Sequence, residues 1–240
     1  MALPKLKIPL FDVTIPSTQK DAKYRPFLVK EEKILLMAQT GSSKMEIINA
    51  LKQVINNCIV MTDGTHLDID TLTTFDLEYL FLKIRSKSVD NMVTLKFHDH
   101  EDNKDYDFTV SLDDITIKVE PDHTNKVKVD EEVGIILKYP TAGLAGKVSA
   151  SNMTDAETSI FMIKECIEQI YDADNVYLAS EATPAELDEF VDSLNVKAFE
   201  GIQKFFETMP KLYHKIEYTN SKGTDRVIEL TTLEDFFTLG

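Results

Sequence analysis

The spacing of apolar residues changes along this chain from a helical period to a strand period and then back to a helical one. Apolar residues recur every three or four positions between about residues 31 and 86, and again between about residues 154 and 206. Between these regions, residues 90–139 hold several short runs in which apolar and polar residues alternate, separated by polar turns. The pattern predicts an α+β fold, with a helical body from the N- and C-terminal parts and a central antiparallel β insertion.

Both ends of the chain carry hairpin patterns. Residues 10–15 and 23–29 indicate two N-terminal strands, and the second strand should end near Pro26 or lie at an edge, because proline has no N–H to donate. Near the C-terminus, residues 212–218 and 226–230 flank a turn and predict a second hairpin, followed by a short helix or docking tail.

Capping patterns predict where three helices begin, because a hydroxyl and a glutamate three residues later can satisfy the first free N–H groups. The three pairs are Ser43 with Glu46, Thr154 with Glu157, and Thr183 with Glu186. We expect the helix from Thr154 to include Tyr171, and the helix from Thr183 to run unbroken to a point before Pro210. Residues 140–146 indicate a flexible linker.

These elements predict three segments along the chain. Residues 1–89 should hold the N-terminal hairpin and a helical region, residues 90–140 the antiparallel β insertion, and residues 141–240 a second helical region with the C-terminal hairpin and tail.

The charge balance excludes two classes of partner. The chain carries 41 acidic and 26 basic residues, for a formal net charge of −15. Nucleic acids and anionic membranes attract lysine- and arginine-rich surfaces, and no basic run offsets this balance. We therefore expect neither nucleic acid nor membrane as a partner; an acidic surface favours solubility or a basic protein partner.

Cysteine usage points to a reducing compartment. Cys58 and Cys166 are the only cysteines, and both fall on apolar faces of predicted helices, where a free thiol behaves as a small buried hydrophobe. The first residues lack the apolar core of a signal peptide, and no apolar run approaches the roughly 18 residues that span a bilayer. We expect a soluble protein made in a cytoplasm.

Three blocks of sequence stand in a characteristic order. Residues 23–38 read KYRPFLVKEEKILLMA, residues 75–88 contain FDLEYLF and IRSKS, and residues 233–237 read LEDFF. Together they resemble the pattern of baseplate hub proteins of T-even-type contractile-tailed bacteriophages, which share an RPFLVKEEK-LL-A block near the N-terminus. The three blocks span residues 23 to 237.

The resemblance implies a non-enzymatic role as a baseplate hub subunit or a hub assembly factor acting through protein–protein interfaces. It implies other hub and tail proteins as partners, and a location in the virion tail baseplate or in the host cytoplasm during assembly. The alternative is a metal- or nucleotide-dependent enzyme whose site is not visible in the sequence.

No motif makes a positive case for catalysis, a cofactor or a small-molecule substrate. Residues 143–147 resemble a phosphate-binding loop, but the spacing fails and Val148 stands where a hydroxyl should hold magnesium. His98 and His100 share one face of a predicted strand, yet no second ligand pair stands at a recognisable spacing, so a polar hairpin tip is preferred to a metal site. Acidic residues at 63–70 lack the spacing of a calcium loop.

The resemblance adds one point about metals. Some relatives carry cysteine pairs near both hairpins, whereas the corresponding loops here, residues 98–103 and 219–223, contain none. If those relatives bind zinc, the resemblance implies that this chain has lost the site.

The remaining candidates for function are interface residues outside the clear helical cores. They are Arg25, Pro26, Phe27, Phe236 and Phe237, because buried arginine and phenylalanine commonly anchor protein contacts. The alternative is structural: the phenylalanines, Phe27 above all, complete the core. Likewise Arg25 and Arg85 have possible ion-pair partners within the chain at Glu31, Glu32 and Glu78.

Overall fold

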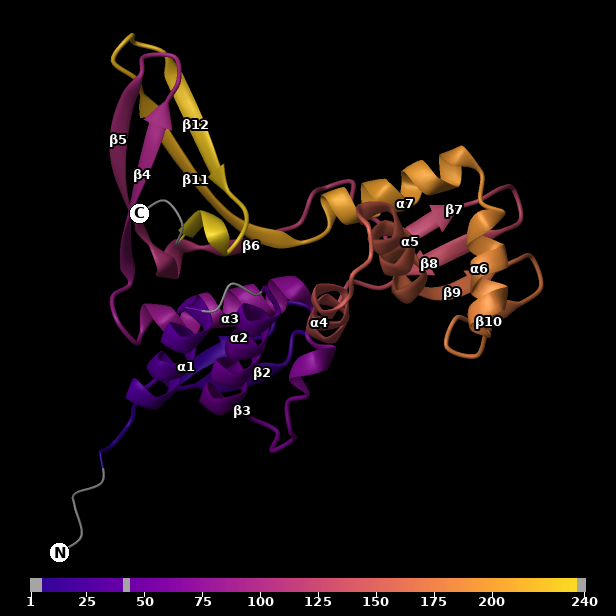
Figure 1. Ribbon diagram of the computed structural model, residues 1–240, viewed down its shortest axis with the longest axis horizontal. Coiled ribbons are helices and arrows are strands. Elements are labelled where there is room, and N and C mark those ends of the chain that lie inside the picture. The colour runs from indigo at the N-terminus through magenta and orange to yellow at the C-terminus, as the bar shows by residue number, and fades with distance from the viewer. Residues whose placement is uncertain (1–5, 41–43, 237–240) are drawn as a thin grey trace, which may run out of the picture. The chain divides into compact units, whose positions relative to one another are not determined.

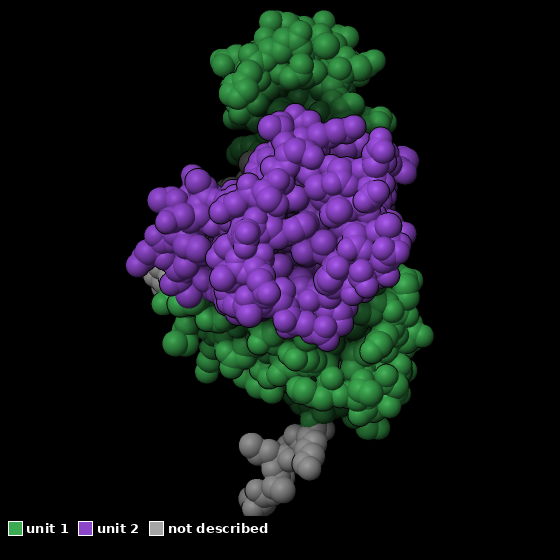
Figure 2. Space-filling model, turned by 90° about the vertical axis from the view of Figure 1, so that its right-hand side faces the viewer, with its two compact units in different colours: residues 1–118, 211–240 green, residues 119–210 purple. Residues whose placement is uncertain are grey.

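The computed structural model describes residues 6–40 and 44–236 and confirms the α+β class (Figure 1). Contacts divide the chain into two compact units, coloured separately in Figure 2. Unit 1 comprises residues 1–118 and 211–240, and unit 2 comprises residues 119–210. Unit 1 therefore combines both ends of the chain, and unit 2 is a continuous stretch between them. The three predicted segments do not follow this division, and as domains they remain a prediction.

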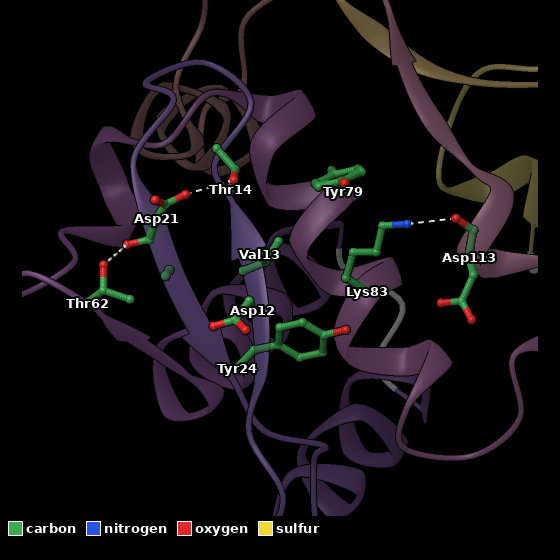
Figure 3. Close-up of a pocket in the computed structure, with 10 residues that line it drawn as sticks. Asp12, Val13, Thr14, Asp21, Tyr24, Thr62, Tyr79, Lys83 and Asp113 are labelled. Atoms are coloured by element: carbon green, nitrogen blue, oxygen red, sulfur yellow. Dashed lines mark hydrogen bonds between the residues drawn. The ribbon is translucent and has the colours of Figure 1, made fainter.

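Unit 1 begins with a three-stranded antiparallel sheet in the order β1, β2, β3. Its strands are Phe11–Thr14, Asp21–Tyr24 and Ile59–Met61. The predicted N-terminal hairpin is present, but its second strand lies two residues earlier than expected and ends before Pro26. Burial alternates along β2, so one face of the sheet is covered, and Figures 1 and 3 show helices on that face.

Three helices cover this sheet: α1 (Val29–Thr40), α2 (Lys44–Cys58) and α3 (Thr74–Ser86). The predicted cap of α2, Ser43, lies outside the described residues. Helix α3 begins with a capping box between Thr73 and Asp76. The buried Asp76 carboxylate also accepts hydrogen bonds from the backbone N–H and the hydroxyl of Ser17, which fastens the β1–β2 turn to the start of α3.

The rest of unit 1 consists of two hairpins and short 3-10 turns. Strands β4 (Met92–Asp99) and β5 (Lys104–Ser111) pair with each other, while β11 (Lys211–Thr219) pairs with both β12 (Asp225–Leu230) and β6 (Thr116–Lys118). The predicted C-terminal hairpin is confirmed. The 3-10 turns are η1 (Ile69–Thr71), η2 (Leu112–Asp114) and η3 (Glu234–Phe236). One buried cluster joins these pieces: Leu82, Leu95, Val110, Leu112, Ile115, Leu212, Leu230 and Phe236.

Unit 2 holds a four-stranded antiparallel sheet in the order β10, β9, β8, β7. Its strands are β7 (Lys126–Lys128), β8 (Gly134–Leu137), β9 (Ile167–Tyr171) and β10 (Val176–Leu178). Its helices are α4 (Ala142–Ala150), α5 (Asp155–Cys166), α6 (Pro184–Asp192) and α7 (Val196–Thr208). The core contains Val127, Ile135, Leu137, Ile163, Ile167, Val191, Ile202 and Phe205.

The central β insertion is not a single sheet. The strands expected between residues 90 and 139 are present, but β4 and β5 form their own hairpin, β6 joins β11, and β7 and β8 join β9. Alternating sequence identifies strands but carries no information about their distant partners, so this pairing could not be predicted from the sequence.

Three helical predictions also require correction. The helix from Thr154 ends at Cys166, and the next residues form β9 instead of continuing to Tyr171. The expected single helix from Thr183 is two helices, because Asn195 caps a new one by accepting a hydrogen bond from Ala198 N–H. The expected linker at residues 140–146 enters α4, which Thr141 caps.

Candidate assembly surface

The first of the three sequence blocks, residues 23–38, is built around an ion pair between Arg25 and Glu31. Arg25 Nη2 lies 2.9 Å from Glu31 Oε1, and Arg25 also donates to the backbone oxygens of Pro26 and Asn57, each at 2.9 Å. The Arg25 side chain is 15% exposed and the Glu31 side chain is fully buried. The guanidinium therefore joins the end of β2 to the start of α1 and the end of α2.

Glu31 is held in its ionised form. Burial raises the pKa of its carboxyl, but hydrogen bonds from Arg25, from the Leu28 N–H and from Lys30 outweigh burial and bring the pKa to about 2. The position in the first turn of α1 adds the favourable field of the helix dipole. Of the intrachain partners that the sequence left open for Arg25, the structure selects Glu31.

The first two blocks meet at Phe27. Its side chain is 8% exposed, and its N–H donates to the Ser88 hydroxyl at 2.9 Å. Ser88 in turn donates to the carbonyl of Ile84 at the end of α3. Phe27 therefore belongs to the core of unit 1, in agreement with the alternative that this phenylalanine completes the core.

The third block packs against the second. Phe236 is 1% exposed and lies in the same buried cluster as Leu82 of α3. Beside it, the Asp235 carboxylate accepts hydrogen bonds from the N–H groups of Thr231 and Thr232, at 2.7 and 2.8 Å. Phe237 lies outside the described residues. The structure brings Arg25, Pro26, Phe27 and Phe236 into the framework of unit 1, and their use as partner contacts remains a prediction.

The same first block leaves a set of apolar side chains in solvent. Leu28, Val29, Leu36 and Met37 are 38%, 66%, 55% and 74% exposed. Residues seven or eight apart share one face of a helix, so Val29, Leu36 and Met37 lie on the same side of α1. We call these four residues the α1 apolar patch. Exposed apolar patches of this kind mark protein contact sites.

A groove of about 700 Å³ lies in unit 1 beside the β1–β2 hairpin (Figure 3). Its walls come from β1, β2, α3, η2 and the loop after β3. The lining residues are Asp12, Val13, Thr14, Asp21, Ala22, Tyr24, Thr62, Tyr79, Lys83 and Asp113. Acidic side chains outnumber the single lysine, so the groove is polar and mainly negative.

Some polar groups of this groove bond to one another. Lys83 Nζ donates to the backbone oxygen of Asp113 at 3.0 Å, and the Asp21 carboxylate accepts from the Thr14 hydroxyl at 2.9 Å (Figure 3). Burial lowers the pKa of Lys83 and raises the pKa of Tyr24 to about 12, so the Tyr24 hydroxyl stays neutral near pH 7. The Lys83 hydrogen bond therefore joins α3 to η2, and the Thr14 hydrogen bond joins β1 to β2.

The tips of the β4–β5 and β11–β12 hairpins in unit 1 are joined by a polar network. Asp99 Oδ2 accepts hydrogen bonds from Tyr218 Oη at 2.7 Å and from Asn220 Nδ2 at 3.3 Å, and its side chain is fully buried. Asn220 Nδ2 also donates to Glu101 Oε2 at 2.7 Å. The hydrogen bond from Tyr218 and those from the Glu101 N–H and Asn220 outweigh burial and lower the pKa of Asp99. The loops at 98–103 and 219–223 therefore hold each other directly.

The histidines near these tips make other contacts. His98 Nδ1 lies 2.7 Å from Asp105 Oδ1, and the rings of His98 and His100 pack edge to face with centres 5.2 Å apart. Within residues 6–40 and 44–236, no three His, Cys, Asp or Glu side chains are grouped so as to hold a metal ion.

Both cysteines are free and buried, as expected from their helical positions. Burial raises the pKa of Cys58 to about 11 and that of Cys166 to about 12, which leaves both thiols protonated near pH 7. A protonated thiol is a poor nucleophile.

Sequence reasoning missed one element that shapes the surface. Strand β10 carries Val176, Tyr177 and Leu178, all exposed, at the edge of the unit 2 sheet. The signal was present: residues 172–175 hold an aspartate-rich turn, and a β-branched and an aromatic residue follow it.

Comparison with known proteins gives one match. A family model described as T4 bacteriophage base plate protein matches residues 8–238. Neither a curated protein nor a solved structure matches the chain. In the part of the chain that the structure describes, no helix is long and apolar enough to cross a membrane. Because the family model covers nearly the whole chain, including all three sequence blocks, the chain belongs to the T4 bacteriophage base plate protein family.

Proposed function

We propose that this base plate protein is a component of the baseplate hub, or a factor that assembles the hub, and that it acts through protein–protein interfaces without catalysis. The α1 apolar patch carries the proposal. In the first block, Arg25, Phe27 and Glu31 hold the fold, whereas Leu28 and Val29 point apolar surface into solvent.

Apolar surface exposed to water is unfavourable in free energy. Contact with another protein removes this surface from water. Burying apolar surface contributes about 25 cal/mol for each square ångström removed from water. Three of the exposed side chains stand on α1, and Leu28 directly precedes it. The Arg25–Glu31 pair and the hydrogen bond from Leu28 N–H to Glu31 fix this start of the helix, so the patch is presented in one defined geometry. A preorganised surface loses little entropy on binding.

A matched pair of substitutions tests the proposal. Val29 and Val196 are both the first residue of a helix, and their side chains are 66% and 75% exposed. Glutamate is favourable in the first turn of a helix, so Val29→Glu and Val196→Glu should both fold. Each variant would replace the natural protein in an infection by a phage lacking its own copy.

The proposal expects Val29→Glu to lower the yield of complete tails by tenfold or more, while Val196→Glu leaves that yield unchanged. Thermal unfolding of the two purified variants checks that both fold. Equal yields from Val29→Glu and the natural protein would reject the α1 apolar patch as an assembly contact.

A further inference from the structure

The edge of the unit 2 sheet is open along β10. Ala179 N–H donates to Glu168 O, and Asp172 N–H donates to Asn175 O, both at 3.0 Å. Hydrogen-bonded pairs alternate along an antiparallel ladder, so Tyr177, which lies opposite Ile170, turns its backbone groups toward β9. Val176 and Leu178 therefore turn theirs away from the sheet.

Among the described residues, three of these four outward backbone groups have no hydrogen-bond partner. The carbonyl of Leu178 accepts a hydrogen bond from Glu181 N–H at 3.0 Å, which leaves the Leu178 N–H and both backbone groups of Val176. In the described part of the chain, no strand lies beyond β10. The residues of this edge reach solvent, since Val176, Tyr177 and Leu178 are 62%, 51% and 40% exposed.

A groove of about 540 Å³ runs beside this edge. It is formed by β9, β10, the loop after β10 and α6, and Figure 1 shows α6 beside β10 in unit 2. Most of its lining is apolar: Val133, Ile170, Tyr171, Val176, Tyr177, Leu178, Ala182, Leu187 and Phe190.

The charged groups of this groove all have one sign. They are Asp172, Glu181 and Glu186, and no lysine, arginine or histidine is among the lining residues. Hydrogen bonds from backbone N–H groups at 174 and 175 lower the pKa of Asp172, and those from Thr183 lower the pKa of Glu186. The groove thus combines an apolar floor, an acidic rim and an unpaired strand edge.

We propose that this groove binds an extended segment of a partner base plate protein, apolar at alternate positions and flanked by lysine or arginine, which adds as a fifth strand along β10. Backbone hydrogen bonds to Val176 and Leu178 hold such a segment, alternate side chains enter the groove, and the basic flanks meet the acidic rim. A second copy of this chain fits less well, because its own β10 would bring the same acidic flanks to the same rim.

This inference rests on the proposed function for the identity of the partner, but its chemistry can be tested alone. The probe is a synthetic peptide of alternating valine and threonine flanked by lysines, titrated against the full-length protein by fluorescence anisotropy. The control peptide carries glutamates in place of the lysines. We expect binding of the lysine peptide only.

Two substitutions locate the site and one controls for charge. Leu178→Pro removes an N–H that points away from β9, so it should abolish binding while leaving the β9–β10 ladder intact. Glu181→Lys reverses an exposed rim charge and should weaken binding by about fivefold or more. Glu200→Lys makes the same charge change on α7, the helix that packs on β7 at the opposite edge of the sheet, and should leave binding unchanged.

The outcomes separate the two proposals. Equal binding of both peptides, or binding that Glu181→Lys and Glu200→Lys weaken equally, overturns the inference, as does self-association through β10 in place of peptide binding. If the full chain enters tails or binds tail proteins but never binds the lysine peptide, the inference fails and the proposed function stands. If the peptide binds at β10 but no tail protein associates with the chain, the proposed function fails instead.

Discussion

Arg25 and Glu31 form a two-pronged ion pair, with Nη2–Oε1 and Nη1–Oε2 distances of 2.9 and 3.4 Å, around a carboxylate that has no exposed surface. A buried charge without its partner is costly, so the arginine is required by the fold once Glu31 is in place. This relationship gives a structural reason for the most recognisable block of the sequence.

Removing the arginine should destabilise the protein strongly. We expect Arg25→Met to lower the free energy of unfolding by about 3 kcal/mol, because it takes from the buried Glu31 carboxylate its two-pronged partner and leaves only Lys30 and the Leu28 N–H beside it. Urea unfolding measures the change. The control is Lys23→Met, two residues earlier on β2, which breaks the ion pair with Asp12 between side chains that are 48% and 85% exposed; it should cost less than about 0.5 kcal/mol. Equal losses in the two variants would show that the buried pair has no special role.

The pH dependence of stability should reveal the contact between Glu78 of the second block and the third block, residues 233–237. Burial raises the pKa of Glu78 in α3 to about 7, with the nearby charges of Asp235 and Glu234 acting in the same direction and a hydrogen bond from Leu233 N–H opposing them. An acid whose pKa is raised by folding stabilises the protein below its unfolded pKa, and that contribution disappears as pH rises through the folded pKa. Between pH 4.5 and 7 the Glu78 contribution should therefore fall, by at most about 3 kcal/mol.

Glu78→Gln isolates this effect. The stability difference between this variant and the natural protein should change between pH 4.5 and 7 and be constant at higher pH. Glu31→Gln provides the contrasting case: its lowered pKa of about 2 means that Glu31 stabilises the fold above pH 4.5 and loses this contribution as pH falls toward 2. Parallel stability profiles for Glu78→Gln and the natural protein would contradict the assignment.

The joined hairpin tips of unit 1 should open when Asn220 is removed. Its amide nitrogen donates to Asp99 and Glu101, and its Oδ1 accepts from the N–H groups of Lys222 and Thr224, both at 3.0 Å. Asn220→Ala should speed hydrogen exchange at residues 98–104 and 219–225. Exchange in unit 2 should stay as in the natural protein. Unchanged exchange at both tips would mean that the network does not hold them together.

Gly134 makes room for the ring of Tyr171. A Cβ at this position would lie 2.2 Å from the tyrosine hydroxyl and 2.3 Å from the adjoining ring carbon. Gly134→Ala should cost about 1–3 kcal/mol, because the ring must leave its place across β8. In the double variant Gly134→Ala with Tyr171→Ala, the alanine at 134 should cost much less. Additive losses in the cycle would exclude this steric explanation.

Local chemistry was predictable from the sequence where neighbouring residues decide the structure. The capping boxes at Thr154 and Thr183 are formed as predicted, and so is the start of α6 at Pro184. These signals succeed because every hydrogen bond in a capping box joins residues three apart. Glu31 could be proposed as a partner of Arg25 because the two lie only six residues apart in the sequence.

Long-range pairing decided the elements that the sequence misassigned. Ile163, Ile167 and Ile170 have helical spacing, yet Ile167 and Ile170 lie in β9, because strands on both sides supply ladder hydrogen bonds to β-branched residues. The break before Asn195 was signalled by the run Asp-Ser-Leu-Asn, whose polar members favour caps over helix interiors.

The candidate site was only partly accessible from sequence. The sequence singled out the first block but could not divide all its residues between core and surface. The strand at 176–178 was not predicted, because three residues are too few to show a period and the turn at 172–175 was the only signal beside their β-favouring side chains. Its open edge follows from the order of strands in the sheet, a property of the whole unit 2.

Quantitative mass spectrometry of purified virions, together with complexes captured on the tagged protein from infected cells, tests the central claim most directly. The account predicts a small fixed copy number in each particle for a hub subunit, or specific complexes with unassembled hub proteins for an assembly factor. Absence from virions together with no bound tail protein in infected cells would contradict it.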